Sequence, residues 1–160
     1  LSLHDALPIL RDDIETIHAA TDLLAEAKLS PELRNEALYY RAKAYTKQKA
    51  DKKAVDDLRE LAKDTRNAYG AEAKYLVAQS LYDAKEYNAA EKELLNYIEQ
   101  STPHAYWLAR SFVLLSDVYA AMGKDLDARQ YLLSLQQNYQ GNDDIATMIE
   151  SRLSKLKVKN

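Results

Sequence analysis

The sequence predicts an all-α protein, and three features of its composition lead to that prediction. Ala and Leu contribute 24 residues each of the 160, and both favour helices. Gly and Pro together contribute only six residues, well below an average of about 12%. Val, Ile and Thr together contribute 17 residues, which is little material for the pleated surface of a sheet. These proportions exclude an all-β fold and a doubly wound α/β fold.

Charge, Cys content and hydropathy narrow the classes of function. The formal net charge is −3, whereas a nucleic-acid binder needs a surplus of Lys and Arg to neutralise phosphates. The absence of Cys excludes disulfides and Cys-bound metals. The longest uninterrupted apolar runs are five residues, against about 20 for a membrane-spanning helix. We therefore expect no nucleic-acid partner and no direct membrane insertion.

Residues 1–9 are expected to be artefactual or disordered. The chain begins at Leu1 without an initiator Met, and the residues from His4 to Ile9 resemble the translation of a sequencing-adapter junction. We therefore assign residues 10–160 to a single helical-repeat domain, because this length is about that of one domain.

An internal repeat organises the chain. Three units cover residues 35–68, 71–104 and 109–142, so their starts lie 36 and 38 residues apart. Small residues recur at two positions of each unit, where two antiparallel helices of a pair would cross most closely. These small residues are Ala42, Ala78 and Ser116 in the first helices, and Ala54, Ala90 and Ala128 in the second helices.

The central unit resembles the tetratricopeptide repeat (TPR) family. That family has a small residue at the eighth position, a large apolar or aromatic residue at the eleventh, Tyr at the seventeenth and Ala at the twentieth. The matching residues here are Ala78, Leu81, Tyr87 and Ala90. The first and third units depart from the pattern, because they have Asp51 and Asp125 where the family has Tyr.

The resemblance implies a right-handed α-solenoid of antiparallel helix pairs that ends in a capping helix at about residues 143–157. The slightly lengthened units and the sequence of residues 103–111 resemble envelope-associated bacterial members of the family. The resemblance therefore also implies a bacterial periplasm or cell envelope as the location.

Capping signals and helical periodicity predict the helix boundaries. Ser30 before Pro31 is typical of an N-cap followed by Pro in the first turn, and Ser101 or Thr102 before Pro103 repeats that pattern. The predicted repeat helices cover residues 31–48, 51–66, 70–84, 87–99, 103–122 and 125–138.

Two further helices are expected at the ends of the repeats. An upstream helix is predicted by the apolar spacing of Ile14, Ile17, His18 and Leu24. The closing helix is expected to be capped by Asp143 or Asp144.

The TPR resemblance also implies where a ligand would bind. In that family the ligand lies in a concave groove lined by the first helix of each unit. Tyr side chains there offer broad contact area, and Lys side chains can meet acidic groups of a peptide. The implied function is a non-catalytic scaffold that binds a peptide or protein segment. The groove candidates are Tyr39, Lys43, Lys47, Tyr75, Gln79, Tyr82, Arg110 and Asp117.

No pattern in the sequence indicates catalytic chemistry. The adjacent acids Asp12-Asp13, Asp56-Asp57 and Asp143-Asp144 are interpreted as helix caps or solvated side chains, since neighbours on a helix point in different directions. We therefore expect no catalytic residue, no cofactor-binding residue and no metal ligand.

Two alternatives to the scaffold remain. The chain could be the docking or regulatory region of a larger enzyme or envelope assembly whose other domains are missing. A helical-repeat RNA reader would need basic residues repeated along one face, whereas Lys43 and Lys47 are followed at the same positions by Gln79 and Asp83.

Overall fold

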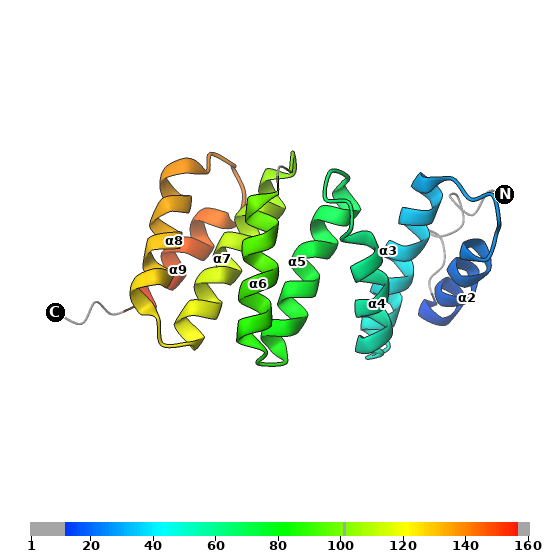
Figure 1. Cartoon of the computed structure of the whole chain (residues 1–160), viewed down its shortest axis with the longest axis horizontal. Coiled ribbons are helices and arrows are strands. Elements are labelled where there is room, and N and C mark those ends of the chain that lie inside the picture. The colour runs from blue at the N-terminus through cyan, green and yellow to red at the C-terminus, as the bar shows by residue number, and fades with distance from the viewer. Residues whose placement is uncertain (1–11, 101, 157–160) are drawn as a thin grey trace. The chain divides into compact units, whose positions relative to one another are not determined.

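The computed structural model describes residues 12–100 and 102–156, and within these it contains eight α-helices and no strand (Figure 1). This confirms the prediction of an all-α fold. Residues 1–9 lie outside the described residues. The helices are α2 (Asp13–Leu24), α3 (Pro31–Lys47), α4 (Asp51–Leu61), α5 (Ala68–Asp83), α6 (Tyr87–Glu99), α7 (Ala105–Ala121), α8 (Asp125–Asn138) and α9 (Ile145–Lys155).

The chain divides into two compact units, Leu1–Val77 and Ala78–Asn160, and each is described by itself. In the first unit α3 packs against both α2 and α4. In the second unit α6 packs against α7, α7 against α8, and α9 against both α7 and α8. Helices therefore pack mostly against their neighbours in sequence. Within the described part of the chain, no helix is long and apolar enough to cross a membrane.

The small residues at the predicted crossing positions are buried. The six side chains from Ala42 to Ala128 that recur in the repeat are each at most 3% exposed. A small side chain lets two helix backbones approach closely, which a Leu or Tyr at the same place would prevent. The prediction that these positions lie in the core is confirmed.

Several helix caps also agree with the sequence. The Ser30 hydroxyl accepts a hydrogen bond of 3.3 Å from the backbone N–H of Leu33, and Pro31 occupies the first turn of α3. An Asp143 carboxylate oxygen accepts from the N–H of Ile145 at 3.0 Å. These side chains satisfy backbone donors that have no partner inside the helix.

The boundaries of α4, α5 and α7 differ from the prediction. α4 ends at Leu61 instead of residue 66, because residues 62–67 form a turn that Asp64 and Asn67 stabilise. The Asn67 side chain then accepts a 2.8 Å hydrogen bond from the N–H of Gly70. α5 therefore begins at Ala68, two residues earlier than predicted.

The start of α7 was also predicted too early. The hydroxyl of Thr102 accepts a 3.2 Å hydrogen bond from the N–H of His104. This local turn holds Pro103 outside the helix, which begins at Ala105. The capping pattern of Ser30 and Pro31 is therefore not repeated here.

α2 confirms the predicted upstream helix, but of the four residues that predicted it only Leu24 packs against a core cluster. Thr16, Ala20 and Leu23 are its buried residues, whereas Ile14 is 52% exposed. Ala20 and Leu23 form a core cluster with Ala37 of α3. The small side chains of Ala20 and Ala37 allow close packing of the two helices, and this contact decides which face is covered.

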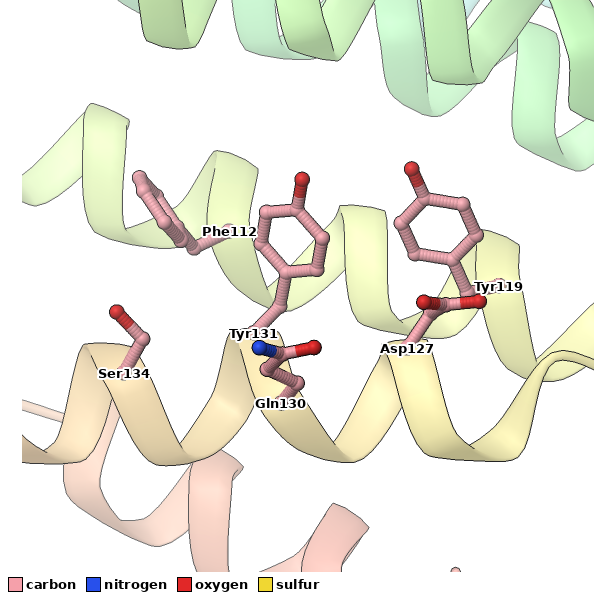
Figure 2. Close-up of a pocket in the computed structure, with 6 residues that line it drawn as sticks. All are labelled: Phe112, Tyr119, Asp127, Gln130, Tyr131 and Ser134. Atoms are coloured by element: carbon pink, nitrogen blue, oxygen red, sulfur yellow. The ribbon is translucent and has the colours of Figure 1, made fainter.

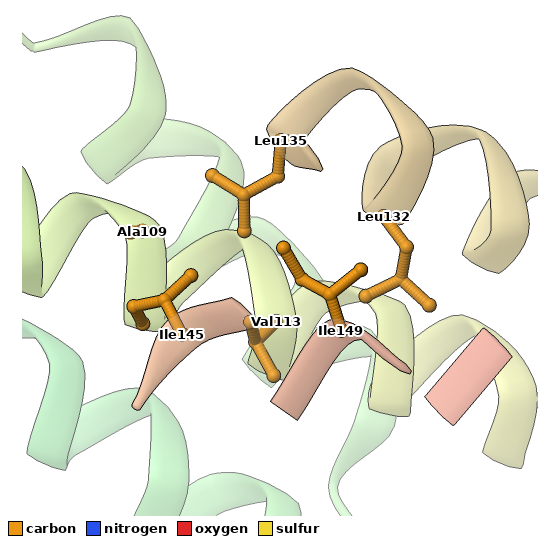
Figure 3. Close-up of a cluster of buried hydrophobic side chains, with 6 residues drawn as sticks. All are labelled: Ala109, Val113, Leu132, Leu135, Ile145 and Ile149. Atoms are coloured by element: carbon orange, nitrogen blue, oxygen red, sulfur yellow. The ribbon is translucent and has the colours of Figure 1, made fainter. Parts of the chain in front are cut away.

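The core of the second unit joins three helices (Figure 3). Ala109 and Val113 of α7 contact side chains of α8 and α9. The C-terminal α9 thus covers apolar side chains of the last helix pair, which is the role expected of a closing helix. The remaining members of this cluster are Leu132, Leu135, Ile145 and Ile149.

The same helix-ending turn occurs three times among the residues that the structure describes. Lys49, Lys85 and Gly123 have positive φ angles of 57°, 61° and 74°. The residue after each donates its backbone N–H to the carbonyl five residues earlier, at 2.8 to 2.9 Å, as in a Schellman motif. These positions are 36 and 38 residues apart, the same intervals as between the units of the sequence repeat.

Introducing a glycine at one of these turns and removing the glycine at another are expected to change the free energy of unfolding in opposite directions. Lys85→Gly should raise the free energy of unfolding by roughly 0.5–1 kcal/mol, because a Cβ is unfavourable in the left-handed region. Gly123→Ala should lower it by about 1 kcal/mol. A Cβ at Gly123 would have no neighbour within 4 Å, so this loss would come from the backbone alone. Urea unfolding measures both changes, and coincident midpoints for the three proteins would contradict the prediction.

Candidate functional site

The groove candidates fall into two clusters, each within one unit. The Tyr39 cluster consists of Tyr39, Lys43 and Glu72, and it lies in the first unit. The Asp117 cluster consists of Asp117, Arg152 and Tyr82, and it lies in the second unit. Tyr82 is included because the charges of Asp117 and Arg152 both act on the pKa of its hydroxyl.

In the Tyr39 cluster, one carboxylate of α5 holds two side chains of α3. The Tyr39 hydroxyl donates to Glu72 Oε2 at 3.0 Å, and Lys43 Nζ lies 2.5 Å from Glu72 Oε1. Lys43 Nζ also lies 5.1 Å from the centroid of the Tyr39 ring, within the range of a cation–π contact. Burial raises the pKa of Tyr39, and the Glu72 charge and hydrogen bond raise it further, so the hydroxyl remains a donor at neutral pH.

Two more Tyr rings extend the Tyr39 cluster. The centroid of Tyr39 lies 5.5 Å from that of Tyr40 and 4.7 Å from that of Tyr69. All three side chains are partly exposed. They offer aromatic contact area beside the Lys43–Glu72 ion pair, a mixture that suits peptide recognition.

In the Asp117 cluster, the closing helix pairs with α7. Arg152 Nε and Nη2 donate to the two oxygens of Asp117 at 2.7 and 2.8 Å, a bidentate geometry. Burial is the main cause that raises the pKa of Tyr82, and the negative charge of Asp117 adds to it. The Tyr82 ring lies 5.6 Å from the ring of Tyr87. This bidentate pair ties α9 to the first helix of the last pair.

Three other candidates have polar partners that belong to neither cluster. Lys47 Nζ lies 3.4 Å from Asp13 of α2, and the Gln79 amide donates to Asp83 of its own helix at 2.9 Å. Arg110 donates to the Tyr106 hydroxyl at 3.1 Å. Lys47 is exposed, Gln79 and Arg110 are partly exposed, and none of the three belongs to either cluster.

Tyr75 differs from the other candidates because it is buried. Only 5% of it is exposed, so it has almost no surface to offer a ligand. It lies four residues after Ala71 and three before Ala78, which are both buried, and this spacing places it on the packed side of α5. The expectation of an exposed groove tyrosine at this position is therefore not met.

An ion pair in the first unit was missed by the sequence analysis. Asp57, interpreted as a solvated acid, accepts two hydrogen bonds of 2.8 and 2.7 Å from Arg41 and is buried. The interpretation as a helix cap holds for Asp12 and Asp143 but is wrong for Asp57. Its spacing from Ala54 and Leu61 on the buried face of α4 was the available signal.

A pocket of about 350 Å³ in the second unit was also not predicted (Figure 2). It lies along α7 and α8. On α8, Gln130 and Tyr131 lie three and four residues after Asp127, and Ser134 lies four and three residues after them, so the four share one helix face. This spacing was the signal in the sequence. The pocket is lined by Phe112, Tyr119, Asp127, Gln130, Tyr131 and Ser134.

Comparison of the chain with models of protein families, with curated protein sequences and with solved structures found no match. The paired helices, the recurring turn and the two polar-aromatic clusters therefore supply the argument for function.

Proposed function

We propose that this chain is a non-catalytic TPR-like scaffold, with its helix pairs stacked as a right-handed solenoid, and that it binds a peptide or protein segment. The ligand would lie on the surface formed by the first helices of the pairs. The recurring turns at the repeat spacing and the buried small residues support the TPR-like register.

One observation carries the proposal. Tyr39 and Lys43 of α3 reach Glu72 of α5, so two first helices contribute side chains to one surface in the first unit. That surface combines Tyr rings with charged groups and remains partly exposed. Tyr rings supply contact area at low conformational cost, and the polar groups orient a peptide backbone or acidic side chains.

Selection from a phage-displayed library of random peptides would test the proposal. We expect peptides that bind the parent protein with affinities measurable by calorimetric titration. For each of Tyr39→Ala and Tyr82→Ala, at least one selected peptide should bind about tenfold or more weakly, since exposed Tyr residues are frequent hot spots.

Two controls separate binding from stability. Leu126→Ala changes a residue that is 77% exposed on a second helix and should leave both affinity and melting temperature unchanged. Tyr75→Ala removes a buried ring and should lower the melting temperature. The proposal is wrong if no peptide is recovered, or if folded Tyr39→Ala and Tyr82→Ala proteins bind every selected peptide like the parent.

A further inference from the structure

Three aromatic rings form a continuous wall in the pocket between α7 and α8. The Tyr131 ring centroid lies 5.5 Å from that of Tyr119 and 5.9 Å from that of Phe112. Figure 2 shows the three rings side by side, with Tyr131 between the other two. The faces of such rings carry a negative electrostatic potential, which attracts cations.

Polar side chains of α8 line the same pocket. Asp127, Gln130 and Ser134 follow one another along one face of the helix (Figure 2). Among the described residues, these three side chains have no hydrogen-bond or ion-pair partner. Each carries an oxygen that accepts hydrogen bonds, and Asp127 adds a full negative charge. The pocket therefore presents acceptors beside its aromatic wall.

The charges around Tyr119 agree with a site for a cation. Burial raises the pKa of Tyr119, and the nearby carboxylate of Glu91 on α6 raises it further, which places a second carboxylate near the aromatic wall. Lys124 Nζ lies 5.5 Å from the centroid of the Tyr119 ring. One end of the wall thus already holds a cation of this chain, while no cation from residues 12–100 or 102–156 lies over the rings of Tyr131 and Phe112.

An apolar pocket of about 400 Å³ adjoins this site and shares Phe112 and Ser134 with it. Its lining continues along the same two helices and is mainly apolar. A ligand that filled both pockets would need a cationic group next to a large apolar group. The other residues of this second pocket are Ala105, Leu108, Ala109, Leu135, Asn138 and Tyr139.

We propose that the pocket of Figure 2 binds an arginine side chain of a partner protein segment, and that a large apolar residue next to this arginine occupies the adjoining pocket. A guanidinium is flat and can stack on the Tyr131 ring beside Phe112, whose ring is tilted by 55° to that of Tyr131, whereas an ammonium is a compact, strongly hydrated charge. Its N–H groups can at the same time donate to Asp127, Gln130 and Ser134. This site shares no residue with the Tyr39 and Asp117 clusters.

Three matched short peptides test this assignment by titration of the isotopically labelled full chain, followed by NMR. They contain Arg-Leu, Lys-Leu or citrulline-Leu between glycines, and citrulline keeps the shape of arginine without its charge. We expect the arginine peptide to shift resonances of Phe112, Tyr131 and their neighbours. It should bind about tenfold more tightly than the citrulline peptide, and more tightly than the lysine peptide.

Two neighbouring acids of α8 provide the matched variants. Asp127→Asn should remove most of the preference for arginine over citrulline, because the charge partner is lost. Asp125→Asn removes the same charge from an exposed residue outside the pocket lining and should keep the preference. Tyr131→Leu should weaken binding of the arginine peptide about fivefold or more while an apolar side chain continues to fill its place.

The assignment fails if the arginine and citrulline peptides bind equally, if neither binds, or if the two Asn variants behave alike. Tighter binding of the lysine peptide would show a general cation site and would overturn the choice of arginine. Tyr82→Ala, which tests the proposed groove, should leave these titrations unchanged, so the two proposals can fail independently.

Discussion

Asp57→Ala is expected to lower the free energy of unfolding by about 3–5 kcal/mol, the largest effect of the substitutions considered. The Asp57 side chain is only 8% exposed and that of its partner Arg41 only 19%. Arg41 also donates to the Thr21 hydroxyl at 3.1 Å, so this pair links α2, α3 and α4. The hydrogen bonds from Arg41 to Asp57 are the main cause that raises the pKa of Arg41. Because a guanidinium is charged at neutral pH even without such bonds, Asp57→Ala leaves Arg41 as a charge without its partner.

Urea unfolding with two matched proteins would isolate the cause. Asp56→Ala removes an exposed acid next in sequence and should change stability by less than about 0.5 kcal/mol. Arg41→Met combined with Asp57→Leu should recover much of the loss, since apolar residues of similar volume often replace a buried pair without cost. If Asp57→Ala is as stable as Asp56→Ala, the ion pair does not hold the three helices together.

Leu132→Ala is expected to cost about 2–5 kcal/mol by leaving a cavity in the core of the second unit. Leu132 is 0% exposed and lies in the cluster that joins α7, α8 and α9 (Figure 3). Neighbours from three helices cannot all move to fill the space, because each is held by its own helix.

Leu126→Ala on the same helix is the control, since its side chain is 77% exposed and its truncation leaves no cavity. The free energies of unfolding of both variants follow from urea titrations monitored by circular dichroism. Equal stabilities of the two variants would show that the cluster in Figure 3 does not form the core in solution.

The repeat and its helices could be predicted from sequence because their signals are local. Helical spacing, Ser30 before Pro31, and small residues at a fixed interval each act within a few turns of one helix. The three Schellman turns occur at the intervals of the sequence repeat for the same reason, although only Gly123 among them is a glycine. Residues 62–67 escaped prediction because Asp64 and Asn67 form a turn within a stretch that otherwise favours helix.

The candidate site was predicted only in part. Tyr39 and Lys43 do lie on one partly exposed surface, since residues four apart share a helix face. Tyr75 was placed beside them by the repeat position alone, and the structure buries it. Whether a Tyr is core or surface depends on which neighbouring helix covers it, and a repeat position does not specify that.

By itself the sequence determined an all-α chain, the register of the repeat and the small residues at helix crossings, because each depends on spacing along one helix. Only the tertiary structure decided that Arg41 meets Asp57, that Arg152 meets Asp117, and that rings from α7 and α8 line one pocket. Asp117 and Arg152, for example, are 35 residues apart in the chain. Such contacts depend on how helices pack, because packing decides which charges and rings come together. The free energy that an ion pair contributes depends in turn on how deeply packing buries it.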